Sequence, residues 1–365
     1  MTFDKAALAW HLPWDADWVT AVTFVGKSRT LAAGNNLGEI LIWDLPEKPT
    51  TEMPKPTRML VGHSNVVSRL RSSADGRWLI SSSYDRTIRV WDMQAPAGKE
   101  SVDLVLNART IADAEARKNN GAKVPPPIPA KVEKRDAAKV LDQHKEWVGS
   151  FSFNKDQSLM LSGDDSGELI LWNFPQMKEA SRWKTRNWVY AVALSPDGSQ
   201  AVVTERRPLV FDSARQASVK LWDTKTGKVI KDLEADFKGM YLSAAEYSAD
   251  GKLLALGRGG ECDSTGGKIF LHNPADGKRI RELTPGHLSG LTDLAFHPDG
   301  RHIASSGRDT VIRLFDLTDG KMVKELGKGR GGQFKDWICA LSFTADGQYL
   351  AGGDMAGGVQ VYTLA

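Results

Sequence analysis

Residues whose type and spacing could support catalysis or cofactor binding are few in this 365-residue chain. Gly327–Gly332 has the G-x-G-x-x-G spacing that brings a backbone close to the pyrophosphate of a dinucleotide. That chemistry requires the glycines between a strand and the N-terminus of a helix, whereas the residues after Gly332 are strand-like. Gly267 and Lys268 fail as a phosphate-binding loop, because Cys262 stands where the first glycine is required. We therefore expect no nucleotide cofactor.

The sequence also lacks the usual signatures of metal sites and nucleophiles. Cys262 and Cys339 have no cysteine partner at metal-ligand spacing, and the seven histidines include no H-x-x-x-H pair on a predicted helix. No G-x-S-x-G nucleophile elbow occurs. The sequence thus predicts no metal and no catalytic residues.

Composition narrows the class of protein. The chain has 48 basic and 45 acidic residues, a net charge of +3, and both signs are interspersed. Nearly neutral charge argues against strong contacts to the phosphates of a nucleic acid. No apolar run approaches the roughly 20 residues that span a bilayer, and no secretory signal opens the chain. We expect a cytoplasmic protein without a membrane partner.

A repeated segment organises almost the whole chain. Its signature is apolar-x-apolar-aromatic-acid, as in Ile88–Asp92, and two of its seven copies are degenerate. The aromatic position is occupied in turn by Trp43, Trp91, Trp172, Trp222, His272, Phe315 and Tyr362. Successive spacings are 48, 81, 50, 50, 43 and 47, so only the second is out of line. Upstream of the signatures, Asp-Gly pairs such as Asp197-Gly198 follow strand-like runs and predict hairpins. Each unit therefore contains three or four short strands.

Period, strand count and the Trp-Asp dipeptide resemble the blades of the WD-repeat family. The resemblance covers about residues 15–365 and implies an all-β, seven-bladed β-propeller that forms one domain, 1–365. The chain stops soon after the last signature, so the last blade needs an outer strand. Lys5–His11 is the only strand-like run left for it. We expect this N-terminal strand to pair with the last blade and close the ring.

The resemblance also implies a buried hydrogen-bond network within some blades, built from His, Ser or Thr, Asp and Trp. Unit two matches fully, and unit six matches except that Phe315 replaces Trp. Unit three has His144 but Ser166 where Asp belongs, which predicts a weaker blade. A His–Ser–Asp set could suggest a catalytic triad, but its repetition favours a structural network. The network residues are His63, Ser81, Asp85, Trp91, His287, Ser305 and Asp309.

An insertion loop, residues 94–138, explains the long spacing between units two and three. Thr110–Asp113 resembles a capping box, Ala112–Lys118 favours a helix, and Pro125–Pro129 favours an extended polyproline segment. We expect the insertion to precede the outer strand of its blade and to emerge on one face of the ring, called the bottom face. It is either a docking arm or a loop without a role.

Function is expected on the opposite face, the top face, where the family places the loop that enters each innermost strand and the loop between the second and third strands. The residue that opens the innermost strand is aromatic in five units, and nearby loops add tyrosine and arginine. The candidate partner-binding residues are Trp18, Trp147, Trp188, Tyr241, Trp337, Tyr84, Arg206, Arg207 and Arg308. Two interpretations of the aromatic rim remain open, contact with a partner and packing between blades.

The preferred hypothesis is a non-catalytic scaffold or adaptor that binds a peptide or partner domain on the top face, with a monomer favoured. One alternative is a propeller hydrolase or lyase with its site at the channel mouth, for which Glu261 and Asp263 are acidic candidates. Another alternative is a nucleic-acid-associated propeller.

Overall fold

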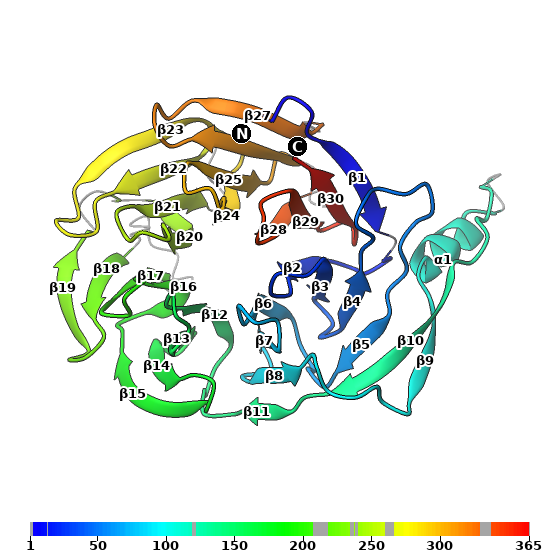
Figure 1. The fold of residues 1–365 in the computed structure, drawn as a ribbon, viewed down its shortest axis with the longest axis horizontal. Helices are drawn as coiled ribbons and strands as arrows, with labels where there is room; N and C mark the ends of the chain where they lie inside the picture. The colour runs from blue at the N-terminus through cyan, green and yellow to red at the C-terminus, as the bar shows by residue number, and fades with distance from the viewer. Residues whose placement is uncertain are drawn as a thin grey trace.

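The computed structural model describes residues 3–12, 14–118, 122–206, 218–233, 237, 240–259, 266–328 and 337–364. These residues form seven sheets that stand around a common axis as the blades of a propeller (Figure 1). The first strand of each repeat lies closest to the axis, and later strands lie progressively outward. The seven-bladed propeller predicted from the repeat is confirmed.

In each blade the strands follow one another outward from the axis. Blade 1 begins with β2 (Val19–Phe24), β3 (Thr30–Asn35), β4 (Ile40–Asp44) and β5 (Arg58–Val61). Blade 2 contains β6 (Val67–Ser72), β7 (Trp78–Ser83), β8 (Ile88–Asp92) and β11 (Lys139–Leu141). Blade 3 contains β12 (Val148–Phe153), β13 (Leu159–Asp164), β14 (Glu168–Asn173) and β15 (Lys178–Lys184). Blade 4 contains β16 (Trp188–Leu194), β17 (Gln200–Arg206), β18 (Ser218–Asp223) and β19 (Lys228–Asp232).

The other blades continue this order. Blade 5 contains β20 (Tyr241–Tyr247), β21 (Leu254–Gly259), β22 (Gly267–His272) and β23 (Arg279–His287). Blade 6 contains β24 (Leu291–Phe296), β25 (His302–Gly307), β26 (Val311–Asp316) and β27 (Met322–Gly327). Blade 7 contains β28 (Ile338–Phe343), β29 (Tyr349–Asp354), β30 (Val359–Thr363) and, outermost, β1 (Ala7–Leu12).

Tight Asp-Gly turns join the first two strands of most blades. In blade 4, Ser195 Oγ donates to Asp197 Oδ1 at 2.6 Å and accepts the Gln200 N–H at 2.9 Å. Gly198 has φ +72°, a conformation that costs glycine little. The side-chain bonds and the glycine together fix the reversal of the chain.

The apolar core lies between blades. The second and third strands are buried on both faces, and the indoles of Trp43, Trp91 and Trp172 are almost completely enclosed. One core cluster joins Ile80 and Val90 of blade 2 to residues of blade 3 that include Trp172. Because each sheet packs against its neighbours, the blades stabilise one another around the ring.

The N-terminal strand closes the ring. β1 pairs antiparallel with β30, with Leu12 opposite Val359, so blade 7 combines both ends of the chain (Figure 1). Phe3, Trp10 and Leu12 from this segment are buried. The expected closure is confirmed, with the strand one residue longer at its C-terminal end than the predicted segment.

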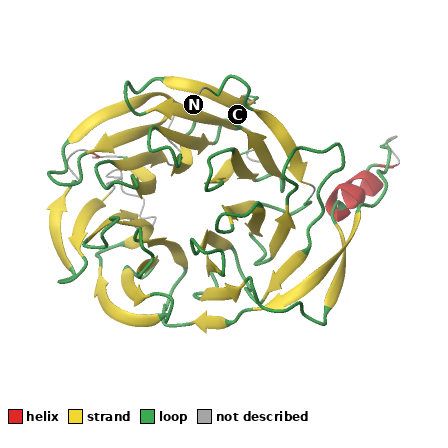
Figure 2. Ribbon diagram, in the orientation of Figure 1, coloured by secondary structure: helices red, strands yellow, loops and turns green. Residues whose placement is uncertain are grey.

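The segment between β8 and β11 differs from the expected loop. It contains β9 (Ser101–Val105), α1 (Ala108–Ala116) and β10 (Pro129–Asp136), and β10 pairs in parallel with β5. Blade 1 therefore has six strands, and the helix lies at the outer rim of the ring (Figure 2). Ala130 and Val132 are buried in the core cluster that contains Trp43. Part of the segment thus extends the sheet of blade 1, where a loop was expected, and its role as a docking arm stays a prediction.

The predicted capping box is wrong, because the helix begins before it. Asn107 occupies the N-cap without a side-chain capping bond, and its amide instead bonds the backbone of Pro126 and Ile128. The Thr110 N–H donates to the carboxylate of Asp15. A residue of the main ring therefore caps this helix. Within the residues described above, no helix has the length and apolar character to cross a bilayer.

Candidate functional site

The aromatic residues of the predicted rim open their innermost strands on the top face, and they differ in exposure. Trp18 and Trp147 are each 44% exposed, whereas Trp188, Tyr241 and Trp337 are half-buried. The carbonyls of Trp18, Trp147 and Trp337 accept N–H bonds from the loop between the second and third strands of the same blade. The rim is therefore rigidly attached and still open to solvent.

Most rim aromatics also stack on a second side chain. Tyr84 of blade 2 lies parallel to Trp147 of blade 3, with ring centroids 4.9 Å apart and an interplanar angle of 7°. Burial raises the pKa of Tyr84 to about 12. Arg308 of blade 6 places its guanidinium 4.2 Å from the ring of Trp337 in blade 7. These stacks show that rim residues pack between blades, while Trp147 remains 44% exposed. Contact of the rim with a partner remains a hypothesis.

Blade 4 contributes a cation between two aromatic rings. The Arg206 guanidinium lies 5.3 Å from the ring of Trp188 and 5.3 Å from that of Tyr190. Tyr190 is 39% exposed and stands at the bulge of β16, where the other innermost strands have small residues. The residues at this bulge position are Thr20, Ser68, Gly149, Ser243, Thr292 and Cys339.

Tyr190 was not among the residues predicted from the sequence. Comparison of the repeats at the bulge position would have found it, because only blade 4 carries a large side chain there. The predicted Arg207 lies outside the described residues, as do Glu261 and Asp263, the acidic candidates of the enzyme hypothesis.

An acidic group accompanies this aromatic cluster. Asp165 follows β13 on the top face, and its N–H bonds the carbonyl of Trp147 at 3.0 Å. Burial raises the pKa of Asp165 to about 6, although the positive charge of Arg206 opposes the rise. The blade 2–4 part of the top face therefore combines exposed aromatic surface with one cation and one carboxyl group.

An ion pair crosses the ring axis below the rim. Arg69 Nη1 of β6 lies 3.0 Å from Asp293 Oδ1 of β24, and blades 2 and 6 stand opposite each other (Figure 1). Asp293 Oδ2 also accepts the Leu341 N–H of blade 7 at 2.9 Å. The other residues at this register level are small: Ala21, Ser150, Ala191, Ala244 and Ala340. This pair was not predicted from the sequence, because it connects residues 224 positions apart.

A second Arg–acid combination occupies the next register level. Arg71 belongs to β6, and Glu246 belongs to β20 of blade 5. Glu246 Oε2 accepts the Phe296 N–H at 3.3 Å. Burial raises the pKa of Glu246 to about 7, and Arg71 opposes the rise. No ion pair joins the side chains of Arg71 and Glu246, both of which are described, and burial favours the protonated form of the carboxyl group.

This titration predicts a pH-dependent stability. Between the ordinary carboxyl pKa of 4.5 and the folded value of about 7, the folded protein retains a proton that the unfolded chain has lost. Stability conferred by the protonated group is therefore lost as pH rises through this window. Glu246→Gln keeps an acceptor for the Phe296 N–H and carries no charge. We expect urea unfolding to show the variant up to about 3 kcal/mol more stable than wild type at pH 8.

At pH 4.5 the two proteins should be nearly equally stable, because the wild-type carboxyl group is then neutral in the folded state. An equal difference at both pH values would contradict the assignment to ionisation of Glu246.

The His–Ser–Asp sets form closed hydrogen-bond networks. In blade 2, His63 Nδ1 lies 2.7 Å from Asp85 Oδ2, His63 Nε2 lies 2.7 Å from Ser81 Oγ, and the Trp91 indole donates to Ser81 Oγ at 2.9 Å. Burial would raise the pKa of Asp85, but its hydrogen bonds to His63 and Thr87 hold that pKa well below the usual range. Ser81 is fully buried, so a substrate could not reach it. This geometry is that of a structural network.

Blade 6 has the same network with one substitution. His287 Nδ1 lies 2.7 Å from Asp309 Oδ1, and Nε2 lies 2.8 Å from Ser305 Oγ. Phe315 has no indole N–H to add, whereas Arg313 pairs with Asp309 at 2.7 Å. Burial lowers the pKa of His287 despite the neighbouring carboxylate, so the neutral ring is favoured.

Blade 3 corrects the prediction made from Ser166. Asp164, two residues earlier, lies 3.0 Å from His144 Nδ1, and Ser162 bonds both His144 Nε2 and the Trp172 indole. Ser166 donates to Asp164 at 2.7 Å. The network is complete because the end of β13 supplies the carboxylate, and the shifted position hid it from a comparison of aligned repeats.

Comparison with a protein-family model agrees with this geometry. The model described as WD domain, G-beta repeat, matches residues 54–92, 136–173 and 277–316. These segments contain the inner strands of blades 2, 3 and 6, the blades that hold the three networks. The matched segments are WD repeats, and together with the seven-bladed ring they support membership of the WD-repeat family.

Several curated proteins are similar in sequence to this chain over most of their length. The small ribosomal subunit protein RACK1 of Caenorhabditis elegans is 23% identical over 340 residues, which cover 87% of this chain and 98% of that protein. The cross-pathway control WD-repeat protein 2 of Flammulina velutipes is 24% identical over 339 residues, covering 87% and 100%. The target of rapamycin complex subunit wat1 of Schizosaccharomyces pombe is 23% identical over 212 residues, covering 54% and 62%.

Proposed function

We propose that this WD-repeat propeller is a non-catalytic scaffold that binds a protein partner through the top face, at the part of the rim formed by blades 1 to 4. The observation that carries the proposal is the exposure of Trp18, Trp147 and Tyr190 on elements held firmly by backbone hydrogen bonds. Rigid, amphipathic aromatic side chains bury a large area with little loss of conformational entropy, so they are common energetic centres of protein interfaces.

The composition of this surface favours a protein partner. Arg206 between two aromatic rings presents a cation, and Asp165 nearby presents a carboxyl group. A peptide that inserts apolar side chains against the rings and pairs its polar groups with these charges fits such a surface. The relatives named above include a protein of the small ribosomal subunit and a subunit of the target of rapamycin complex, and both names describe members of larger assemblies.

Alanine variants of the rim test the proposal. The triple variant Trp18→Ala, Trp147→Ala, Tyr190→Ala removes exposed rings without touching the buried networks. We expect it to lose at least 100-fold in affinity for a partner captured by the wild-type chain, because each ring at an interface centre contributes about 2 kcal/mol or more. Capture from a lysate of the source organism, quantified by mass spectrometry and followed by calorimetry with the recovered partner, measures the loss.

A matched control uses apolar residues that are exposed elsewhere. Ile230, Ile280 and Met322 lie on the outer strands β19, β23 and β27. Their triple alanine variant removes comparable apolar surface and should retain every partner. Retention of partners by the rim variant, or their loss from the outer-strand variant alone, would contradict the proposed surface.

A further inference from the structure

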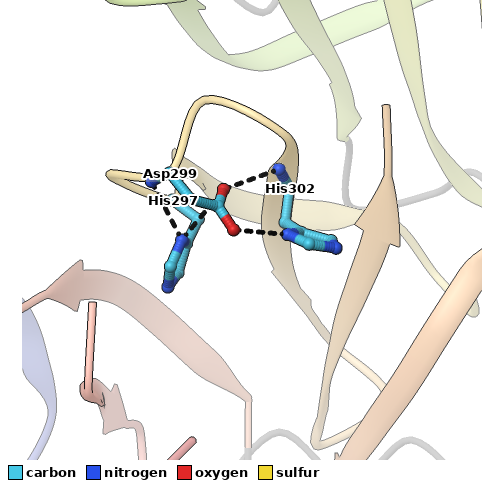
Figure 3. A group of neighbouring side chains, drawn as sticks. All are labelled: His297, Asp299 and His302. Carbon is cyan, nitrogen blue, oxygen red and sulfur yellow. Dashed lines mark hydrogen bonds and ion pairs between the residues drawn. The ribbon is translucent and has the colours of Figure 1, made fainter. Parts of the chain in front are cut away.

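A group of two imidazoles and a carboxylate lies on the bottom face, at the turn between β24 and β25. His297, Asp299 and His302 follow an H-x-D-x-x-H spacing, and both rings point at the carboxylate between them (Figure 3). The two histidines are almost completely buried, whereas the Asp299 side chain is 28% exposed. This group lies on the face opposite the aromatic rim and takes no part in the proposed partner binding.

The donor atoms lie close together. His297 Nδ1 is 3.0 Å from Asp299 Oδ1, His302 Nδ1 is 2.7 Å from Asp299 Oδ2, and one donor atom of each residue lies within 4.8 Å of the others. Zinc–ligand bonds of about 2.0–2.2 Å place neighbouring ligand atoms about 3–3.5 Å apart. Small side-chain rotations would bring all three atoms to these separations. A Cβ built on Gly300, at the tip of the turn, would meet no other atom within 4 Å, so the tip itself is open.

The hydrogen bond on the far side of His297 fixes its tautomer. His297 Nε2 lies 3.0 Å from the carbonyl oxygen of Gly347, which can only accept, so this nitrogen carries the proton. In the neutral ring, Nδ1 then has a lone pair, which receives the Asp299 N–H at 3.1 Å and also faces the carboxylate oxygen at 3.0 Å. An ion bound at Nδ1 would take the place of the Asp299 N–H at this lone pair and would pair with the adjacent carboxylate.

The bond from His297 Nε2 to the Gly347 carbonyl is of a kind common at metal sites. Metal-binding histidines usually donate their other N–H to a carbonyl or carboxylate. Phe3 and Phe343 pack edge-on against the His297 ring at 5.8 and 4.9 Å, which adds the apolar shell that such sites have. Gly347 makes the approach possible, because a Cβ there would lie 2.4 Å from His297 Nε2.

The turn between β24 and β25 differs in its side chains from the corresponding turns of the other blades. In blades 2, 4, 5 and 7 the residue two before the turn aspartate is a serine or threonine that donates to that aspartate, and in blade 3 it is Asn154. Among the described turns of this type, blade 6 alone has an imidazole at this position. It also has a second imidazole, His302, at the first residue of the next strand. A hydroxyl is sufficient to close the turn, so the two imidazoles are not required for folding.

A second group of this kind contains His144, Asp164 and Glu168. Both ring nitrogens of His144 are occupied by Asp164 and Ser162, and Glu168 pairs with Arg182 at 2.8 Å. It belongs to the structural network of blade 3.

We propose that the blade 6 turn binds one divalent transition-metal ion through His297 Nδ1, the Asp299 carboxylate and His302 Nδ1. Two imidazoles and one carboxylate form a ligand set suited to zinc and cobalt, with further positions left for water. In the metal-free protein His302 Nδ1 donates to Asp299 Oδ2, and ligation of the ion through Nδ1 requires the other neutral tautomer, with the proton on Nε2.

Metal titration of the full chain tests this proposal. The protein is first treated with a chelator, and Co²⁺ is then added while the visible absorption is recorded; Zn²⁺ binding is measured by calorimetry. We expect one ion per chain and a rise in melting temperature with Zn²⁺, because the ion binds only the folded turn.

The double variant His297→Ser, His302→Gln recreates the blade 4 turn, in which Ser195 and Gln200 flank Asp197. We expect it to fold and to melt close to the metal-free wild type. Its affinity for either ion should fall at least about 100-fold, since loss of a single outer-shell partner already weakens metal sites 10–100-fold. His11→Gln, which removes an exposed histidine, is the control and should bind as the wild type does.

Absence of stoichiometric Co²⁺ or Zn²⁺ binding by the wild type would overturn the proposal. Equal binding by the double variant would also overturn it. Either result would leave His297 as a residue that closes the turn through its contacts with Asp299 and Gly347.

Discussion

Removal of residues 1–12 is expected to lower the melting temperature of this propeller by about 10 °C or more. The deletion removes β1, exposes the edge of β30 and uncovers the core sites of Phe3, Trp10 and Leu12. Burial of one large apolar side chain contributes about 1.5–3 kcal/mol, so the three together contribute about 5–9 kcal/mol. In domains of 150–250 residues each kcal/mol changes the melting temperature by about 2–4 °C, and less in a larger one such as this. Thermal unfolding followed by circular dichroism measures the change.

Leu8→Ser is the control for this deletion. Leu8 belongs to the same strand, but its side chain is exposed, so the substitution should leave the melting temperature within about 2 °C of wild type. If the deletion variant melted like wild type, the ring would not depend on closure by its N-terminal strand.

The second large effect is expected at the ion pair across the axis. Arg69→Ala leaves the buried carboxylate of Asp293 without its cation, and loss of one partner of a buried ion pair costs about 3–5 kcal/mol. Asp293→Ser should partly compensate. At the equivalent position of blade 3, Ser150 Oγ accepts the Val192 N–H at 3.3 Å, so serine retains the bond between blades that Asp293 makes to Leu341.

A double-mutant cycle measures the interaction energy between Arg69 and Asp293 apart from their other contacts. We expect the double variant to be more stable than Arg69→Ala alone, because no unpaired charge remains. Chemical denaturation of the four proteins measures the coupling. Additive effects of the two substitutions would show that the contact across the axis contributes no net stabilisation.

The sequence predicted the parts of this fold that repeat. Seven signatures, with residues such as Trp91 and Trp172 at the aromatic position, defined the blades, and the blade left without an outer strand identified the closing segment. Local patterns were sufficient for the blades, because the strands of one blade are mostly neighbours in the sequence. The closing strand was predicted because it was the only strand-like run that belonged to no repeat. No local pattern pairs Leu12 with Val359.

Features that depend on distant residues were not predictable in this way. β10 pairs in parallel with β5, although strands β6 to β8 lie between them in the sequence. Asp15 caps a helix that begins more than 90 residues later. The Arg69–Asp293 pair connects opposite blades. Each of these contacts depends on the closed ring, which brings together segments that no local sequence pattern relates.

The candidate site was predictable in position but not in detail. The position that opens each innermost strand located Trp18 and Trp147 correctly on the described top face. The parallel stack of Tyr84 on Trp147 joins two blades, so it follows from the angle between sheets and not from the sequence of either. Tyr190 required a comparison at the β-bulge, whose position becomes certain only from strand register.

Amide hydrogen exchange of the propeller, with and without a partner recovered by capture, measures whether the partner binds the top face. We expect a bound partner to slow exchange in the top-face segments around residues 15–20, 84–87, 145–149 and 186–191, and to leave the outer strands unchanged. Protection confined to the outer strands or to the bottom-face turns, with these segments exchanging as in the free ring, would contradict it.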